Sequence, residues 1–84
     1  MDIQEIFARN LRKLRHAKRL SREELAHRAE LDRTYISALE RSVYATSIDV
    51  VDNLARALGV EAADLLKRPS PQGDKKKGRS LTSS

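Results

Sequence analysis

Residues 31–41, LDRTYISALER, decide the fold of this 84-residue chain. Read at the helical period, Tyr35, Ile36 and Leu39 form one apolar stripe. Asp32 stands just ahead of them, where its carboxylate can accept hydrogen bonds from the free amides of a helix start. The opposite stripe contains short, polar or cationic residues, namely Arg33, Thr34, Ser37, Ala38 and Arg41. The segment predicts a short helix with one buried face and one open face.

The open stripe is unusual for a solvated helix, which would present long side chains of mixed sign. Arg33 and Thr34 stand at the helix start with little bulk beside them. Such an end fits a DNA groove, because arginine can bond to two acceptors of guanine and threonine can touch a thymine methyl group or a phosphate. A helix that only packs against the rest of the protein is the alternative for this segment alone.

A second short helix is predicted immediately before this one, at residues 22–29. Ser21 and Glu24 match the Ser-x-x-Glu capping box, and apolar residues follow at helical spacing. Glu30 stands in the connecting turn, where glycine is common, and the pair reads as a helix-turn-helix. Arg22 is at the first helical position, where its guanidinium and the neighbouring free amides could hold a phosphate.

Three further helices complete the expected all-α fold. The first covers residues 3–18, the fourth lies between the cap Ser47 and Gly59, and the fifth covers residues 60–67 before Pro69. The inward residues expected in the first helix are Ile3, Phe7, Leu11 and Leu14; those expected in the fourth and fifth are Val50 or Val51, Leu54, Ala55, Leu58, Ala62, Leu65 and Leu66.

Charge and composition divide the chain into a folded domain, residues 1–68, and a basic tail, residues 69–84. The domain holds 13 Lys and Arg against 11 Asp and Glu, and the tail holds 4 against 1. Leu81 is the only large apolar residue of the tail, so we expect the tail to be disordered. The net charge of +5 favours a polyanionic partner. The tail either adds non-specific attraction to phosphates or is a solvated linker.

Several classes of protein do not fit the sequence. The absence of cysteine excludes disulfides and cysteine-based sites, and it fits a reducing cytoplasm. No apolar run approaches the roughly 18 residues of a membrane helix, and the acidic start is unlike a secretory signal. His16 and His27 fall on different predicted helices without a nucleophile nearby, and metal-ligand spacings and Gly-rich phosphate loops are lacking. We expect no enzymatic activity, cofactor, metal or membrane partner.

Three strings of this sequence together resemble the phage-repressor or Cro-like helix-turn-helix family, of the xenobiotic-response-element type. They are LRKLRHAKRLSREELAHRA, LDRTYISALERS and LARALGVEAADLL, within residues 7–66. The string LDRTYIS followed by Glu-Arg is especially similar to controller proteins of restriction–modification systems. The resemblance implies a compact five-helix, lambda-repressor-like DNA-binding domain with the helix-turn-helix at helices two and three. It also implies a recognition helix, about residues 33–41, in the major groove.

The resemblance implies roles for individual side chains at the DNA. Arg33 and Thr34 match base-reading positions, whereas Ser37 and Ala38 match positions further along the groove-facing side. Arg22 matches a phosphate clamp at the start of the second helix. At Ala38 only a methyl contact is available.

Further roles concern the end of the recognition helix and the loop after it. Arg41 and Ser42 match the loop that approaches the DNA backbone, although glycine is usual at Ser42. Residues 43–45, Val-Tyr-Ala, replace the polar or basic residues common there, and the first two could instead pack in a dimer interface. Tyr35 matches a residue beside DNA in the controllers; a core-edge residue is the alternative.

Arg15 and Glu40 match a paired arginine and glutamate that many family members hold between helices one and three. Each lies at the edge of an inward face, where burial alone would be costly. We therefore predict that they form an ion pair that fixes the recognition helix to the scaffold.

The function expected from these observations is a sequence-specific, double-stranded DNA-binding transcriptional regulator, acting in the cytoplasm as a homodimer on a palindromic operator. One module reads only a few base pairs, and two copies supply affinity. We expect the dimer surface on helices four and five, with Val51, Leu65 or Leu66 exposed. The alternative is an antitoxin or antirepressor-type module whose main partner is a protein.

Overall fold

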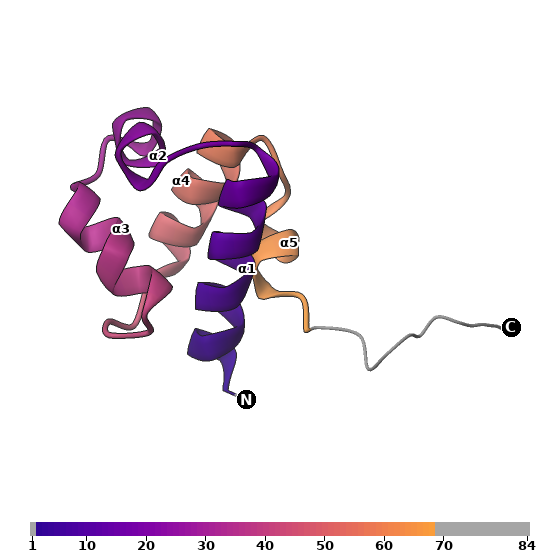
Figure 1. Cartoon of the computed structure of the whole chain (residues 1–84). Coiled ribbons are helices and arrows are strands. Elements are labelled where there is room, and N and C mark those ends of the chain that lie inside the picture. Colours follow the sequence, from indigo (N-terminus) through magenta and orange to yellow (C-terminus); the bar gives the residue numbers. More distant parts are fainter. Residues whose placement is uncertain (1, 69–84) are drawn as a thin grey trace, which may run out of the picture.

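The computed structural model describes residues 2–68, and within this range the chain forms five helices and no strand. The helices are α1 (Ile3–Ala17), α2 (Arg22–Ala29), α3 (Arg33–Glu40), α4 (Ile48–Leu58) and α5 (Ala62–Leu66) (Figure 1). The predicted all-α, five-helix fold is confirmed. The predicted disordered tail, residues 69–84, lies outside the described residues.

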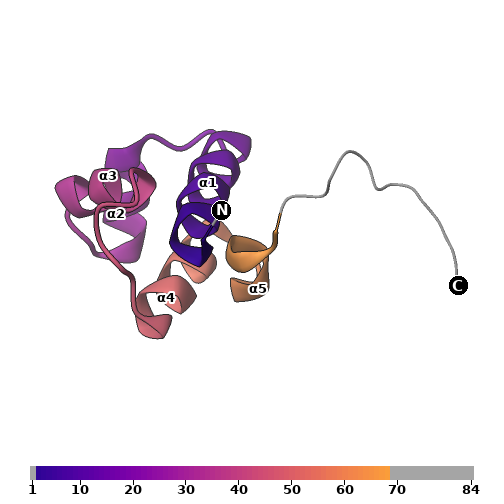
Figure 2. The same cartoon turned by 90° about the horizontal axis from the view of Figure 1, so that it is seen from below.

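Each helix contributes one fully buried aliphatic side chain to a single core. These side chains are Leu11, Leu25, Ile36, Leu54 and Leu65, all 0% exposed. Burial of a side chain of this size stabilises a fold by about 1.5–3 kcal/mol. α1 packs against α3 and α5, and α4 packs against α2 and α5. Figures 1 and 2 show α2 and α3 together on one side of α1, with α5 on the other.

The predicted caps fix where the central helices begin. The Glu24 backbone amide donates to Ser21 Oγ at 3.0 Å, and the Ser21 amide donates to Glu24 Oε1 at 2.8 Å. The bond from the Ser21 amide lowers the pKa of the Glu24 carboxyl group. The Thr34 amide donates to Asp32 Oδ1 at 3.2 Å, and Ser47 caps α4 in a similar way. The starts of α2 and α3, which flank the candidate site, are thus determined locally.

The turn between α2 and α3 forms without glycine. Glu30 adopts a left-handed conformation with φ of 58°, which glycine most often occupies at helix ends. The Leu31 amide donates to the Ala26 carbonyl oxygen at 2.8 Å and closes the last turn of α2. The predicted helix-turn-helix is therefore present.

Some residues expected on one side of a helix lie on the other. Ile3, expected to face inward, is 49% exposed, and Ile6 is buried instead. Val51 and Leu65 are buried in the core, which confirms their expected inward position and removes them from the expected dimer surface. Leu66, expected inward but also considered for the dimer surface, is 39% exposed.

Candidate nucleic-acid interface

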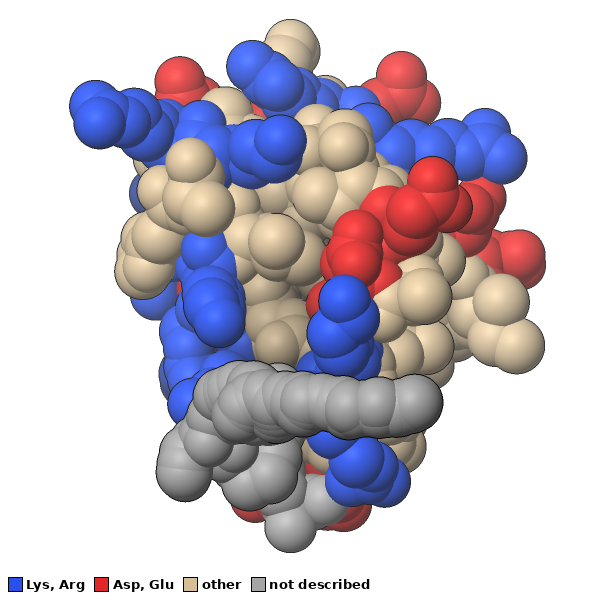
Figure 3. Space-filling view, turned by 90° about the vertical axis from the view of Figure 1, so that its right-hand side faces the viewer, with Lys and Arg blue, Asp and Glu red and all other residues tan. Residues whose placement is uncertain are grey.

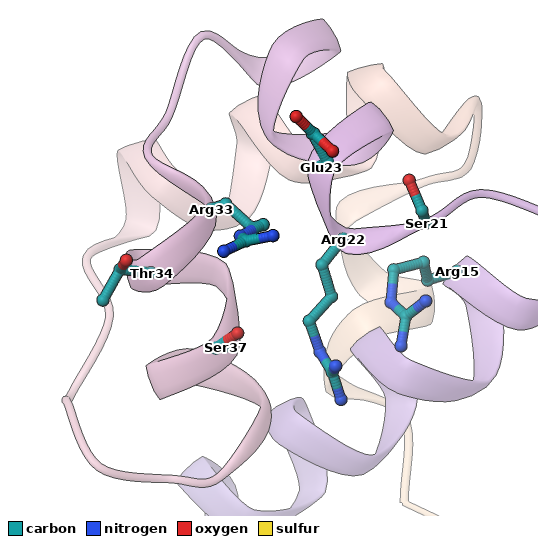
Figure 4. A pocket seen from close by; sticks show the side chains of 7 residues that line it. All are labelled: Arg15, Ser21, Arg22, Glu23, Arg33, Thr34 and Ser37. Atoms are coloured by element: carbon teal, nitrogen blue, oxygen red, sulfur yellow. The ribbon is translucent and has the colours of Figure 1, made fainter.

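The N-terminal end of α3 projects into solvent. Arg33 and Thr34 occupy its first turn and are exposed, whereas Ile36 and Leu39 are buried in the core. In Figure 4, Arg33 extends across the space between α2 and α3, Ser37 points into this space, and Thr34 points away from it. The helix therefore presents its cationic, hydroxyl-bearing end, as the sequence predicts.

An open groove of about 540 Å³ separates the start of α2 from the exposed side of α3. Three of its lining residues are arginines and only one is acidic, so the groove favours an anion (Figure 4). It brings together four of the side chains that were predicted to contact DNA: Arg22, Arg33, Thr34 and Ser37. Its lining residues are Arg15, Ser21, Arg22, Glu23, Arg33, Thr34 and Ser37. We call this the α2–α3 groove.

Arg15 and Glu40 form the predicted ion pair at the base of this region. Arg15 Nε donates to Glu40 Oε2 at 2.6 Å, and Arg15 Nη2 donates to Glu40 Oε1 at 3.2 Å. Arg15 Nη1 also donates to the Leu20 carbonyl oxygen at 2.9 Å. The Glu40 side chain is 1% exposed, so its charge needs these partners. The pair joins α1 to the end of α3.

Arg22 is a second partner of Glu40, which the sequence does not predict. Arg22 Nε donates to Glu40 Oε1 at 2.9 Å, while the Arg22 side chain stays 48% exposed. Two guanidinium groups on one carboxylate leave a net positive charge. Arg22 is thus held by one nitrogen and presents the rest of its guanidinium to the groove. No local spacing signals this contact, because it depends on how α2 lies across α1 and α3.

The structure corrects the position of Ala38. This residue was expected on the open stripe, but it is only 4% exposed. The chain turns back after α3, where the Val43 amide donates to the Ala38 carbonyl oxygen at 2.9 Å. The buried methyl group of Ala38 is therefore unavailable to a base, and the open stripe contains Arg33, Thr34 and Ser37 with Arg41.

Tyr35 lies at the edge of the core with an aromatic neighbour from the following loop. It is half-buried, and its ring centroid is 6.2 Å from that of Tyr44, with the planes tilted by 36°. Such a geometry is favourable for aromatic pairs. Tyr44 is 56% exposed. Sequence reasoning missed this pair, because nothing in the spacing indicates that the loop folds back on α3.

Arg41 and Ser42 close the other end of α3. Arg41 is exposed, and its Nε donates to the Ser37 carbonyl oxygen at 3.4 Å. Ser42 has a φ of 58°, which explains why glycine suits this position. Its Oγ donates to the Gln4 carbonyl oxygen at 3.4 Å and ties the loop to α1.

The described part of the chain contains no group of three or more His, Cys, Asp or Glu residues placed to hold a metal ion. Over the same part, no helix combines the length and apolar character needed to cross a membrane.

A family model of a helix-turn-helix domain matches residues 6–67 of this chain. The match covers all of α2 and α3 and most of α1. The chain therefore belongs to the helix-turn-helix family of transcription regulators, as the resemblance implies.

Two curated relatives and two solved structures show which helix-turn-helix proteins this chain is similar to. A hypothetical transcription factor from Neisseria meningitidis serogroup B is 43% identical over 68 residues, which cover 81% of this chain and 64% of that protein. Its crystal structure superimposes with a TM-score of 0.79. Control protein C.SmaI from Serratia marcescens is 41% identical, with 81% of each chain covered. The restriction–modification controller C.AhdI from Aeromonas hydrophila is 40% identical, with 74% of this chain and 94% of that chain covered and a TM-score of 0.72. The expected similarity to controller proteins is confirmed.

Proposed function

We propose that this protein regulates transcription by binding double-stranded DNA sequence-specifically, as a homodimer on a palindromic operator. α3 enters the major groove with its N-terminal end first, the usual docking of a helix-turn-helix. The observation that carries the proposal is the exposed Arg33 on the first turn of α3, facing a groove whose other side holds Arg22.

Arg33 is the principal base-reading residue of this proposal. Among residues 2–68, its guanidinium has no hydrogen-bond or ion-pair partner, so its five N–H groups are available. Two of them match O6 and N7 of guanine. Thr34 offers a methyl group to thymine, and the Ser37 hydroxyl can donate to or accept from a base edge. Tyr35, half-buried next to Tyr44, offers a hydroxyl group to a base or a phosphate.

Arg22 is the principal phosphate contact. Its Nε is engaged by Glu40, which fixes the direction of the guanidinium plane. The remaining N–H groups face the α2–α3 groove together with Ser21 and the free amides at the start of α2. Arg41 and Ser42 approach the backbone at the other end of α3.

The dimer surface is an apolar pocket between the start of α1, the start of α4 and the end of α5. Ile48 is 87% exposed at its rim, beside Ile3 and Leu66. Thr46 Oγ1, also in the pocket lining, is buried without a hydrogen-bond partner in the described part of the chain. A second copy would cover Ile48 and could bring an acceptor to Thr46. Two-fold symmetry then sets two half-sites about 34 Å apart, one helical turn of DNA.

Selection of bound sites from a random duplex pool tests the whole proposal. We expect an enriched palindrome whose half-sites lie about one helical turn apart. Ile48→Glu should give a monomer by sedimentation and weaken binding to the full site, because it places a charge in the contact. The proposal fails if no sequence is enriched. A stable complex with another protein and no DNA retardation would instead favour the antitoxin or antirepressor alternative.

A further inference from the structure

A second basic groove lies at the opposite end of α3 from Arg33. It has a volume of about 440 Å³ and separates α1 from the end of α3. Three exposed arginines line it, two from α1 and one from the C-cap of α3. The lining residues are Glu5, Ala8, Arg9, Arg12, Glu40, Arg41 and Ser42. We call this the α1–α3 groove. Neither Arg9 nor Arg12 has a role in the function proposed above.

Arg12 is oriented by the recognition helix itself. Its Nη1 donates to the backbone carbonyl oxygen of Glu40 at 2.8 Å, while the residue stays exposed. This bond satisfies a carbonyl group at the helix end and brings a full positive charge to that end. One nitrogen is engaged in this way, and the fork of a guanidinium retains further donors suited to a phosphate.

The carboxylates around this groove do not neutralise its arginines. The Glu40 carboxylate is buried and directed to Arg15 and Arg22. The Glu5 carboxylate accepts the Asp2 backbone amide at 3.0 Å in the capping box of α1. Three arginines therefore face one exposed carboxylate, which leaves an excess of positive charge.

The two grooves meet at Glu40. The Glu40 carboxylate accepts a hydrogen bond from Arg22 Nε at 2.9 Å, and the Glu40 carbonyl oxygen accepts one from Arg12 Nη1 at 2.8 Å. Arg12 therefore extends the positive charge of Arg22 past the end of α3, toward Arg41 in the α1–α3 groove.

Residues 43–45 of the following loop, Val-Tyr-Ala, contain no cation. Arg9 and Arg12 of α1 line the same groove as Arg41 and Ser42, which precede this loop. Figure 3 shows Lys and Arg gathered along its left edge, the side that faces the viewer in Figure 1. Basic side chains thus continue over the side of the molecule on which Figure 4 shows the α2–α3 groove.

We propose that Arg9 and Arg12, together with Arg41, form a second phosphate-binding site next to that of Arg22, at the C-terminal end of α3. This inference rests on the proposed function, because it assumes that α3 occupies the groove. α1 then supplies the cations that the loop after α3 lacks. These contacts are independent of sequence, since phosphates are the same at every base pair.

Salt titration of DNA binding by the Arg9→Gln/Arg12→Gln variant tests this site. Glutamine removes the charge and keeps a shorter polar side chain, and a thermal melt checks that the variant is folded. Each lost phosphate contact lowers the slope of log affinity against log salt by about 0.9, so we expect a decrease of about 1.8. The sequence preference should stay that of the wild type.

Lys13→Gln is the matched control. Lys13 is exposed on the same helix, but it lines the side facing α5 instead of α3. We expect a slope close to that of the wild type. The second site is refuted if the Arg9/Arg12 variant keeps the wild-type slope, or if Lys13→Gln lowers the slope as much per charge. If the second site is refuted but the wild-type protein still selects one DNA sequence, the proposed function stands. If the wild-type protein selects no DNA sequence, both the second site and the proposed function are wrong.

Discussion

The two ends of α3 differ in exposure and in bonding partners, although Arg33 and Glu40 are only seven positions apart. Arg33 at the first turn is exposed and has no side-chain partner among residues 2–68. Glu40 at the last turn is buried, with its carboxylate held by Arg15 and Arg22 and its backbone carbonyl by Arg12. One end is left free to meet a ligand, and the other end is anchored. We infer that the bonds to Glu40 at the last turn hold α3 in place and so position Arg33 at its first turn.

The largest effect is expected at the anchored end. Glu40→Ala removes the carboxylate and leaves the Arg15 charge buried without compensation. We expect the free energy of unfolding to fall by about 3–5 kcal/mol, as measured by urea denaturation. Arg33→Ala on the same helix should change it by less than about 0.5 kcal/mol. If Glu40→Ala and Arg33→Ala lost the same free energy of unfolding, the two ends of α3 would not differ in the way described.

A double substitution separates charge from packing at this site. In Arg15→Met/Glu40→Leu both buried charges are replaced by apolar groups of similar size, while the half-exposed Arg22 keeps its solvent. We expect stability within about 1 kcal/mol of the wild type, because replacing a whole buried pair is often neutral. If the double variant lost as much stability as Glu40→Ala alone, the Arg15–Glu40 pair would stabilise the fold by more than the compensation of two buried charges.

Arg22 shares features of both ends of α3, because it bonds to Glu40 and also faces the α2–α3 groove. Arg22→Ala should weaken binding to all duplexes alike and lower the salt slope by about 0.9, because one phosphate contact is lost. Electrophoretic mobility shifts over a range of salt concentrations measure this. Glutamine at the same position should behave as alanine does. A variant that changes base preference without changing the slope would place Arg22 at a base instead of a phosphate.

Local interactions made much of the fold predictable from the sequence. The caps Asp32, Ser21 and Ser47 act on amides two or three residues away, so their spacing alone identifies them. The Arg15–Glu40 pair was predicted from the resemblance to the helix-turn-helix family, and the position of each residue at the edge of an apolar face, where a lone charge would be costly, agreed with it.

The remaining features depend on how the helices lie across one another. Arg22 reaches Glu40 only because α2 crosses the end of α3, and Tyr44 meets Tyr35 only because the loop folds back. Helical periodicity places a residue on a face, but it does not tell which neighbouring segment covers that face.

The smallest effect concerns the turn that sets the angle of α3. Glu30 has a φ of 58°, a conformation that is costly for a residue with a Cβ atom. Glu30→Gly should raise the free energy of unfolding by about 0.5–1 kcal/mol, since strain relief exceeds the added entropy of the unfolded chain. Thermal melts measure the change.

Gly59 is the matched control for this turn, because it has a φ of 73° and open space where a Cβ atom would lie. Gly59→Ala should therefore lower stability by about 1 kcal/mol through backbone strain alone. Shifts of the same sign for the two substitutions would refute the explanation.

The most direct test of the free end is the binding of Arg33→Ala to duplexes that differ from the selected site by single base pairs. We expect this variant to lose discrimination at one base position of each half-site, at a cost of about 1–3 kcal/mol, while the other positions and the thermal melt stay unchanged. Intact discrimination at every position would contradict the assignment of α3 as the helix that reads DNA.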